Sequence, residues 1–224
     1  MRKFKRDLKD GEILVCGDFA ENFTYVVQNG TQGQHWNNSQ ATIHPIVCYY
    51  RSENELKHFS YVCISDKMEN DTMAVRTFMK HLIDFMKMKL GPIKNMIYFT
   101  DGCSAQYKNK ENLFNLCLHE DDFGIEAEWH FFATSHGKGR GKGPCDGVGG
   151  TVKREARRAS LQSPFRNLIG SAKDLYYWCK GHFKSIEFRY VPKSEIQDTA
   201  SHKGTSSGVS PRFQRNFFCE VFTT

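Results

Sequence analysis

Short apolar runs separated by polar turns recur along the chain, and they predict a protein built on a β-sheet. Apolar runs that are rich in β-branched and aromatic residues and bounded by turn-forming residues are typical of buried strands. Five such runs occur, at residues 12–18, 41–50, 58–65, 96–99 and 127–133. The first three precede any helical pattern, so they predict an antiparallel meander.

The clearest helical pattern lies between the third and fourth expected strands. Asn70 or Asp71 is a suitable N-cap for it, and Gly91 followed by Pro92 ends it. Two further helices are expected, at about 110–119 and, with basic residues, at about 147–160. Residues 120–122 are interpreted as an acidic turn. The apolar side chains of the first helix recur at spacings of three and four, which places them on one face, at Val75, Phe78, Met79, Leu82, Ile83 and Met86.

The expected elements follow the order β-β-β-α-β-α-β-α, which predicts an α/β fold. This order resembles a ribonuclease H-like core. In that core a five-stranded mixed sheet is flanked by helices and carries carboxylates on its first and fourth strands and on its last helix. Asp18, Asp101 and Asp146 fall at those three places.

The three aspartates suggest a specific chemistry. Asp18 and Asp101 end buried strands, which is where α/β sheets place ligands, although a turn or a helix cap explains Asp101 alone about equally well. Mg²⁺ and Mn²⁺ prefer carboxylate oxygens. Two such ions about 3.5–4 Å apart activate a nucleophile and stabilise the leaving oxygen of a phosphodiester. Three aspartates are enough to hold them.

Length and composition fit one globular domain. The 224 residues contain no long low-complexity break, so we expect a core over 11–195, a basic, unpatterned lead at 1–10 and a flexible tail with an aromatic cluster at 196–224. The apolar runs are far shorter than the ~18 residues of a membrane span, and no signal-peptide segment is visible. The eight cysteines form no CxxC pair, which favours reduced thiols in an intracellular protein without a zinc finger.

The net charge of +6 is unevenly placed. Residues 134–158 hold seven lysines and arginines against two acidic residues, so most of the excess positive charge lies around Asp146. A basic patch supplies the sequence-independent part of nucleic-acid binding. A solvated helix face explains the same charges, and the two interpretations remain open.

Six motifs are long enough to be specific. They are DFAEN at 18–22, HW at 35–36, TIHP at 42–45, DGCSAQYKN at 101–109, WHFFATSHGK at 129–138 and GPCDGVGGTVKR at 143–154. Together they resemble a family of transposon-derived proteins in animal genomes whose core is similar to the catalytic domain of DDE/D-type transposases. The resemblance covers about residues 10–195.

The resemblance implies metal-dependent DNA cleavage and strand transfer. Asp18, Asp101 and Asp146 match the catalytic and metal-binding positions, and two Mg²⁺ or Mn²⁺ ions are the implied cofactors. DNA is the implied partner, and a homo-oligomer that pairs two DNA ends is compatible with it. A nuclear location follows from the DNA substrate and the basic character. No membrane association is expected.

Ten polar residues near the expected site are candidates for contact with nucleic acid. Those that follow the fourth strand are interpreted as orienting a substrate phosphate, and those of the glycine-rich loop and the basic helix as binding the DNA backbone. They are Gln106, Lys108, Asn109, His136, Lys138, Lys142, Lys153, Arg154, Arg157 and Arg158.

Two features depart from the family's pattern. The glycine-rich run 137–143 looks like a local duplication of about four residues beside Asp146, and misplacing a catalytic group by even 1 Å can cost ~100-fold in rate. Glycines also allow such an insertion to loop out. Transposases generally carry a separate DNA-binding module, and none precedes Met1, so we expect a catalytic core alone.

Three functional hypotheses therefore stand side by side. The first is a transposase-type core that transfers DNA strands, the second a catalytically silent relic that binds nucleic acid or another partner, and the third a nuclease of the same fold. Zinc binding by His136 and Cys145 with His130 or Cys103 lacks the usual ligand spacing. Residues 137–143 match neither phosphate-loop pattern, which argues against nucleotide hydrolysis.

Overall fold

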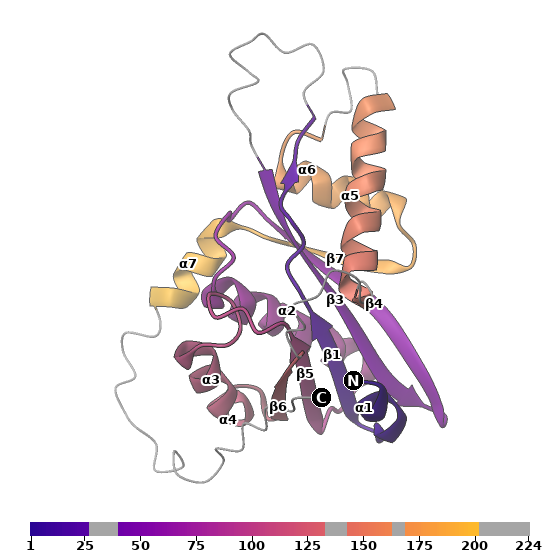
Figure 1. Ribbon diagram of the computed structural model, residues 1–224, viewed down its shortest axis with the longest axis vertical. Helices are drawn as coiled ribbons and strands as arrows, with labels where there is room; N and C mark the ends of the chain where they lie inside the picture. Colours follow the sequence, from indigo (N-terminus) through magenta and orange to yellow (C-terminus); the bar gives the residue numbers. More distant parts are fainter. Residues whose placement is uncertain (27–39, 133–142, 163–168, 202–224) are drawn as a thin grey trace.

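The computed structural model describes residues 1–26, 40–132, 143–162 and 169–201 (Figure 1). Its centre is a mixed β-sheet, and all five expected strands are present in it. Two strands were not expected as part of the sheet, a short one that pairs with β3 and a last one at the sheet edge. The strands are β1 (Glu12–Gly17), β2 (Phe23–Thr24), β3 (Gln40–Ser52), β4 (Glu55–Ser65), β5 (Asn95–Thr100), β6 (Glu126–Phe131) and β7 (Ile186–Val191).

The strands lie in the order β6-β5-β1-β3-β4-β7, with β2 beside β3. β3 runs antiparallel to β1, β2 and β4, whereas the other neighbouring pairs are parallel. Parallel neighbours β1 and β5 therefore end at the same edge of the sheet. The α/β class predicted from the sequence is confirmed, with a mixed sheet of seven strands rather than five.

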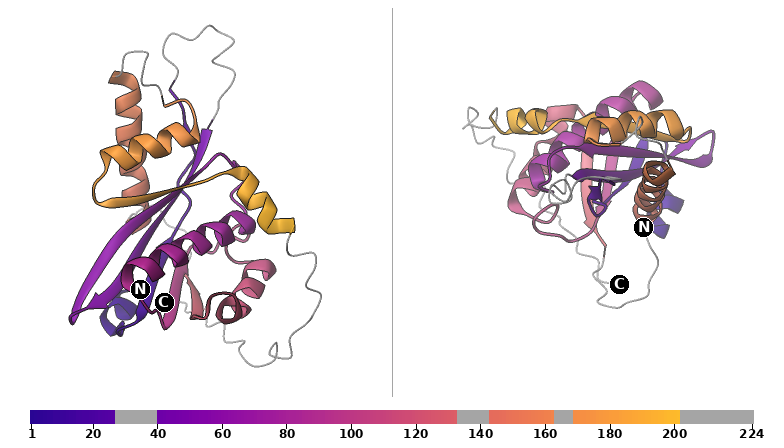
Figure 2. Two further views of the ribbon diagram at one scale, coloured as in Figure 1. Left: turned by 180° about the vertical axis from the view of Figure 1, so that it is seen from behind. Right: turned by 90° about the horizontal axis from the view of Figure 1, so that it is seen from above.

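Helices cover both faces of the sheet. Figure 1 shows α5 on the near side of the strands, and the rear view in Figure 2 shows α2 on the other side. The buried side chains of α2 pack against one face, and those of α5 and α6 against the opposite face. The helices are α1 (Arg2–Asp7), α2 (Thr72–Leu90), α3 (Lys110–Cys117), α4 (His119–Phe123), α5 (Pro144–Gln162), α6 (Ala172–His182) and α7 (Lys193–Ser201).

Helix α2 forms as its sequence predicts. The side chain of Asp71 accepts a hydrogen bond from the Ala74 backbone N–H, which caps the first turn. Gly91 ends the helix with a φ of 80°, a left-handed conformation that costs glycine little. All six apolar residues expected on one face are buried in the core.

Three expectations about irregular segments are wrong. The lead at 1–10 contains α1, because Phe4 and Leu8 pack against apolar side chains of the sheet. The expected acidic turn at 120–122 lies inside α4, which is anchored by the buried His119. The expected tail begins inside α7, where Ile196 is buried against the α2 side of the core; the rest of the tail lies outside the described residues.

Among the described helices, none is both long enough and apolar enough to cross a membrane.

Candidate functional site

Asp18 and Asp101 follow neighbouring parallel strands. Cys16 of β1 lies opposite Phe99 of β5, so continuing the register by two residues brings the two aspartates to the same edge of the sheet. The Asp18 backbone N–H donates to the Pro45 carbonyl oxygen at 3.3 Å. This bond extends the pairing of β1 with β3 past the end of the strand and fixes the backbone at Asp18.

Asp146 reaches the same region from the first turn of α5. The Cys145 thiol donates to the Cys16 carbonyl oxygen at 3.1 Å, which ties the start of the helix to the end of β1. One turn later, α5 lies so close to the sheet that a Cβ on Gly149 would be 3.0 Å from the Cβ of Ala20. Residues 143–150 are therefore held over the strand that ends at Asp18.

Asp18 lies within electrostatic reach of both Asp101 and Asp146. Burial first, and then the negative charges of Asp101 and Asp146, raise the pKa of Asp18 to about 6, against a hydrogen bond from the Phe19 backbone N–H that lowers it. Like charges near one carboxyl favour its protonated form. The structure thus brings Asp101 and Asp146 close enough to Asp18 for their charges to act on it, and these three residues are called the aspartate cluster below.

Two of these carboxylates also make local hydrogen bonds. Asp101 accepts from the Cys103 backbone N–H at 3.1 Å, and Asp146 accepts from the Gly143 backbone N–H at 2.7 Å. In the described part of the chain, no three His, Cys, Asp or Glu side chains are arranged as they stand to hold a metal ion. The donor set suits Mg²⁺ or Mn²⁺, because all three groups are carboxylates, and each bonded aspartate retains a second oxygen.

Helix α5 also carries the described part of the basic patch. Lys153 pairs with Glu21 at 3.4 Å, which places it beside the chain that leaves β1. Glu155 pairs with both Arg154 and Arg158, and those two side chains remain two-thirds exposed. Arg157 is exposed as well. Three arginines on one solvent-facing helix side are thus available to phosphates.

The other candidates for nucleic-acid contact differ in role. Asn109 caps α3 by accepting from the Asn112 backbone N–H, and its amide donates to Thr72 Oγ1 at 2.7 Å. Its side chain therefore stabilises the start of α3 and is not free to bind a substrate phosphate. Gln106 is half-buried, and Lys108 is exposed with its ammonium 5.6 Å from the centre of the Phe131 ring. His136, Lys138 and Lys142 lie outside the described residues.

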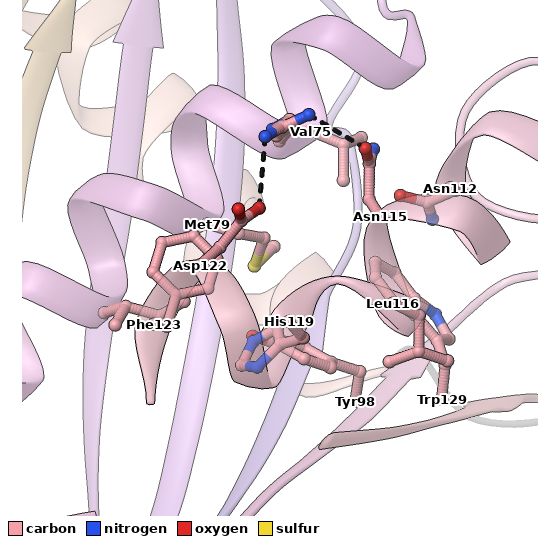
Figure 3. A pocket seen from close by; sticks show the side chains of 12 residues that line it. Val75, Met79, Tyr98, Asn112, Asn115, Leu116, His119, Asp122, Phe123 and Trp129 are labelled. Carbon is pink, nitrogen blue, oxygen red and sulfur yellow. Dashed lines mark hydrogen bonds and ion pairs between the residues drawn. The ribbon is translucent and has the colours of Figure 1, made fainter. Parts of the chain in front are cut away.

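Two hollows accompany these elements. A groove of about 340 Å³ runs beside the first turns of α5 and is lined by His58, Ser60, Gly147 and Thr151, among others. A separate cavity of about 30 Å³ lies between α2, α3 and α4 on the other face (Figure 3), where Arg76 bonds both Asn115 and Asp122. The second has room for about one or two waters, so the groove is the better place for a substrate.

The zinc alternative loses support. Cys145 is buried and donates its thiol hydrogen to a backbone carbonyl, and burial raises the pKa of that thiol, whereas zinc binds the thiolate. His130 bonds Glu128 at 3.0 Å. His136 is not among the described residues.

Sequence reasoning missed two residues next to the aspartates. Tyr107 and His44 are fully buried and bond each other at 2.8 Å. His44 lies in the motif TIHP and Tyr107 in the motif DGCSAQYKN. Their membership in these motifs was the one feature of the sequence that could have marked them as part of the site.

The fold and the site define an α/β protein with an aspartate cluster at the ends of two neighbouring parallel strands. The chain belongs to the family described as Domain of unknown function (DUF8701), whose model matches residues 1–213. None of the curated proteins with which the chain was compared matches it.

The pKa of Asp18 gives a first testable prediction. Asp18→Asn is expected to raise the free energy of unfolding at pH 7.5 by about 1–2 kcal/mol and to give no gain at pH 4. A pKa of about 6 against an ordinary 3.8 means that the folded state binds more protons between about pH 4 and 6. Stability of the parent protein therefore falls as pH rises through that window, and the amide removes the loss.

Urea unfolding followed by circular dichroism at both pH values measures this effect. The change in the free energy of unfolding is expected to be smaller than the full pKa shift implies. Asp18 is partly exposed, so solvent screens its interaction with the neighbouring charges. Glu21→Gln is the matched control, since the Glu21 side chain is 91% exposed. An Asp18→Asn gain of equal size at pH 4 and pH 7.5 would contradict the prediction.

Proposed function

We propose that this chain is a transposase-type catalytic core that cleaves DNA phosphodiesters and transfers strands with two Mg²⁺ or Mn²⁺ ions. One observation carries the proposal: Asp18 and Asp101 follow neighbouring parallel strands in register, and the Cys145 thiol bonds the Cys16 carbonyl oxygen, which brings Asp146 to the same strand ends although the three are far apart in sequence. These carboxylates lie at the ends of two strands and beside a basic helix. Carboxylates bind divalent metal ions and basic side chains bind phosphates, so the arrangement suits a metal ion together with a phosphate substrate.

The strand arrangement supports a ribonuclease H-like interpretation. When β2 and β7 are set aside, the sheet has five mixed strands, and Asp18 follows the first while Asp101 follows the fourth. Asp146 lies on the helix that comes after the fifth. This is the carboxylate placement that the resemblance implies.

Asp18, Asp101 and Asp146 would hold the ions. When bound, the ions would supply an activated nucleophile and would stabilise the leaving oxygen. The Cys103 and Gly143 N–H groups orient the carboxylates of Asp101 and Asp146. Arg154, Arg157 and Arg158 would bind backbone phosphates by charge, without reading bases. The groove that Gly147 lines, one residue after Asp146, offers a path for the DNA strand along the first turns of α5.

Metal titration tests the proposal directly. Calorimetric titration of Mn²⁺ into the parent protein is expected to show binding, and Asp146→Ala is expected to weaken it by about tenfold or more, as loss of a supporting metal contact does. Asp174→Ala is the matched control, because Asp174 is also a first-turn aspartate of a helix on the same face. Equal affinity in Asp146→Ala and the parent would remove Asp146 from the metal site.

A catalytically silent nucleic-acid-binding protein is the second candidate. Two observations favour it. Asp101 and Asp146 each accept a hydrogen bond from a backbone N–H, and no three His, Cys, Asp or Glu side chains of the described residues are arranged as they stand to hold a metal ion. Mg²⁺-dependent nicking of plasmid DNA by the purified protein would contradict it. Products in which DNA ends are joined to a target would separate strand transfer from simple nuclease action.

A further inference from the structure

A hydrogen bond between two fully buried side chains lies beside the aspartate cluster. His44 Nε2 and the Tyr107 hydroxyl oxygen are 2.8 Å apart, and neither residue has exposed surface. His44 comes from β3, whereas Tyr107 belongs to the loop that follows Asp101. The bond therefore joins the sheet to the loop that carries one of the three carboxylates.

That loop is tightly folded between Asp101 and Tyr107. The Cys103 backbone N–H donates to the Asp101 carboxylate, and the Cys103 carbonyl accepts from the backbone N–H groups of Tyr107 at 2.8 Å and Lys108 at 3.0 Å. The Tyr107 carbonyl in turn accepts from the Asn112 side-chain amide. Any shift of the Tyr107 ring is thus transmitted through two hydrogen bonds to the carboxylate of Asp101.

The same pair contacts the chain at Asp18. Phe19, the next residue, packs its ring edge-on against the His44 imidazole with ring centres 4.4 Å apart, and its ring centre is 6.0 Å from that of Tyr107. A buried side chain in such close packing has little room to move. The pair therefore touches the neighbour of one aspartate and the loop of another.

The His44 ring is neutral and is held through its Nε2 atom. Burial lowers the pKa of His44 to about 3, and among the described residues its Nδ1 has no hydrogen-bond partner. The bond to Tyr107 therefore fixes the orientation of the ring, whichever of the two atoms donates.

The Tyr107 hydroxyl lies within the electrostatic reach of two of the aspartates. Burial raises the pKa of Tyr107, and the charges of Asp18 and Asp101 raise it further. The pair is therefore coupled to both carboxylates as well as to the loop and to Phe19.

We infer that the His44–Tyr107 pair positions Asp18 and Asp101 for the metal ions, with Tyr107 acting as the positioning residue and His44 as its buried support. The inference rests on the proposed function. It adds two residues that bind no metal themselves and whose loss changes metal affinity through the aspartates.

The chain provides a matched control for the test. Tyr98 is also buried and also bonds a buried histidine, with its hydroxyl 2.8 Å from Nε2 of His119. Tyr107→Phe and Tyr98→Phe each remove one such hydroxyl and one bond to a buried histidine Nε2; His119 keeps the bond between its Nδ1 and the Ile125 carbonyl oxygen. Only the first pair contacts the Asp101 loop and Phe19.

Two measurements on the full chain are needed, Mn²⁺ affinity by calorimetric titration and hydrogen exchange of the Tyr107 and Lys108 amides. Tyr107→Phe is expected to weaken Mn²⁺ binding about tenfold and to speed exchange of these amides about tenfold, whereas Tyr98→Phe leaves both near parent values. His44→Gln, which keeps a side chain that can hydrogen-bond the Tyr107 hydroxyl, is expected to bind Mn²⁺ more tightly than His44→Leu.

Parent-like affinity and exchange in Tyr107→Phe would overturn the inference, and so would equal changes in both tyrosine variants. Failure of the parent protein to bind Mn²⁺ would overturn the proposed function instead. The exchange rates then still decide whether the pair holds the loop, because they require no metal.

Discussion

Replacement of Asp101 by asparagine is expected to reduce Mg²⁺-dependent nicking of DNA about 10³-fold or more while the protein stays folded. Asparagine keeps the shape of the side chain and its capacity to accept from the Cys103 N–H, so the loop retains its local bond. It removes the negative charge that binds a divalent ion. Losing about 4 kcal/mol of transition-state stabilisation corresponds to a rate factor of about 10³.

Plasmid nicking measured over a range of Mg²⁺ concentrations distinguishes the possible causes. Asp84→Asn is a suitable control, because Asp84 lies on the exposed side of α2 and makes no contact with the cluster. The parent and Asp84→Asn are expected to nick at the same rate. If Asp101→Asn cleaves as fast as the parent, the carboxylate cluster is not the catalytic site.

Substitution of Gly149 by leucine is expected to destabilise the protein by about 2–3 kcal/mol, the cost typical of overpacking a close contact. A Cβ at this position would meet Ala20 Cβ at 3.0 Å and Pro45 Cγ at 3.2 Å. Neither neighbour yields easily, because the Ala20 N–H bonds the Ile43 carbonyl and the Pro45 carbonyl bonds the Asp18 N–H. Helix α5 must then move outward and carry Asp146 with it.

Gly150→Leu gives the matched control on the same helix. A Cβ on Gly150 would meet nothing within 4 Å, and leucine is a better helix former than glycine, so a gain of about 0.5–1 kcal/mol is expected. Thermal unfolding of both variants, together with Mn²⁺ titration, separates packing from propensity. A stable Gly149→Leu protein with parent-like Mn²⁺ affinity would show that α5 need not lie against β1 and β3.

The two tests are independent in what they address. Asp101→Asn tests the charge at the site and leaves the fold alone, whereas Gly149→Leu tests the contact that delivers Asp146 and leaves every carboxylate in the sequence. Loss of Mn²⁺ binding in both would indicate that the third aspartate matters because of where α5 places it.

The sequence by itself determined the local elements. The five strands were predicted because continuous apolar runs reflect burial in a sheet, and helix α2 because its period of 3.6 reflects burial on one face. Asp71 and Gly91 mark the ends of that helix through backbone chemistry that acts over a few residues. Asp18 and Asp101 were found for the same reason, since each ends an apolar run abruptly. The order of the expected elements, which resembles a ribonuclease H-like core, added Asp146.

Tertiary structure alone decided the elements whose stability comes from distant contacts. α1, β7 and α7 are short. Leu8, directly after α1, and Val191 and Ile196, in β7 and α7, are buried against apolar side chains from other parts of the chain. Short helices are marginal on their own, so packing rather than propensity forms them. No local pattern in residues 1–10 or 193–201 indicates that these segments pack against the core.

The composition of the site was likewise decided in three dimensions. The sequence predicted that the three aspartates would share one site, but it did not indicate that Asn109 would serve as a helix cap. It also did not indicate that His44 and Tyr107, 63 residues apart, would meet between Asp18 and the loop after Asp101. Hydrogen bonds and charge interactions act over a few ångströms in space, and only the folded sheet brings these residues within that range.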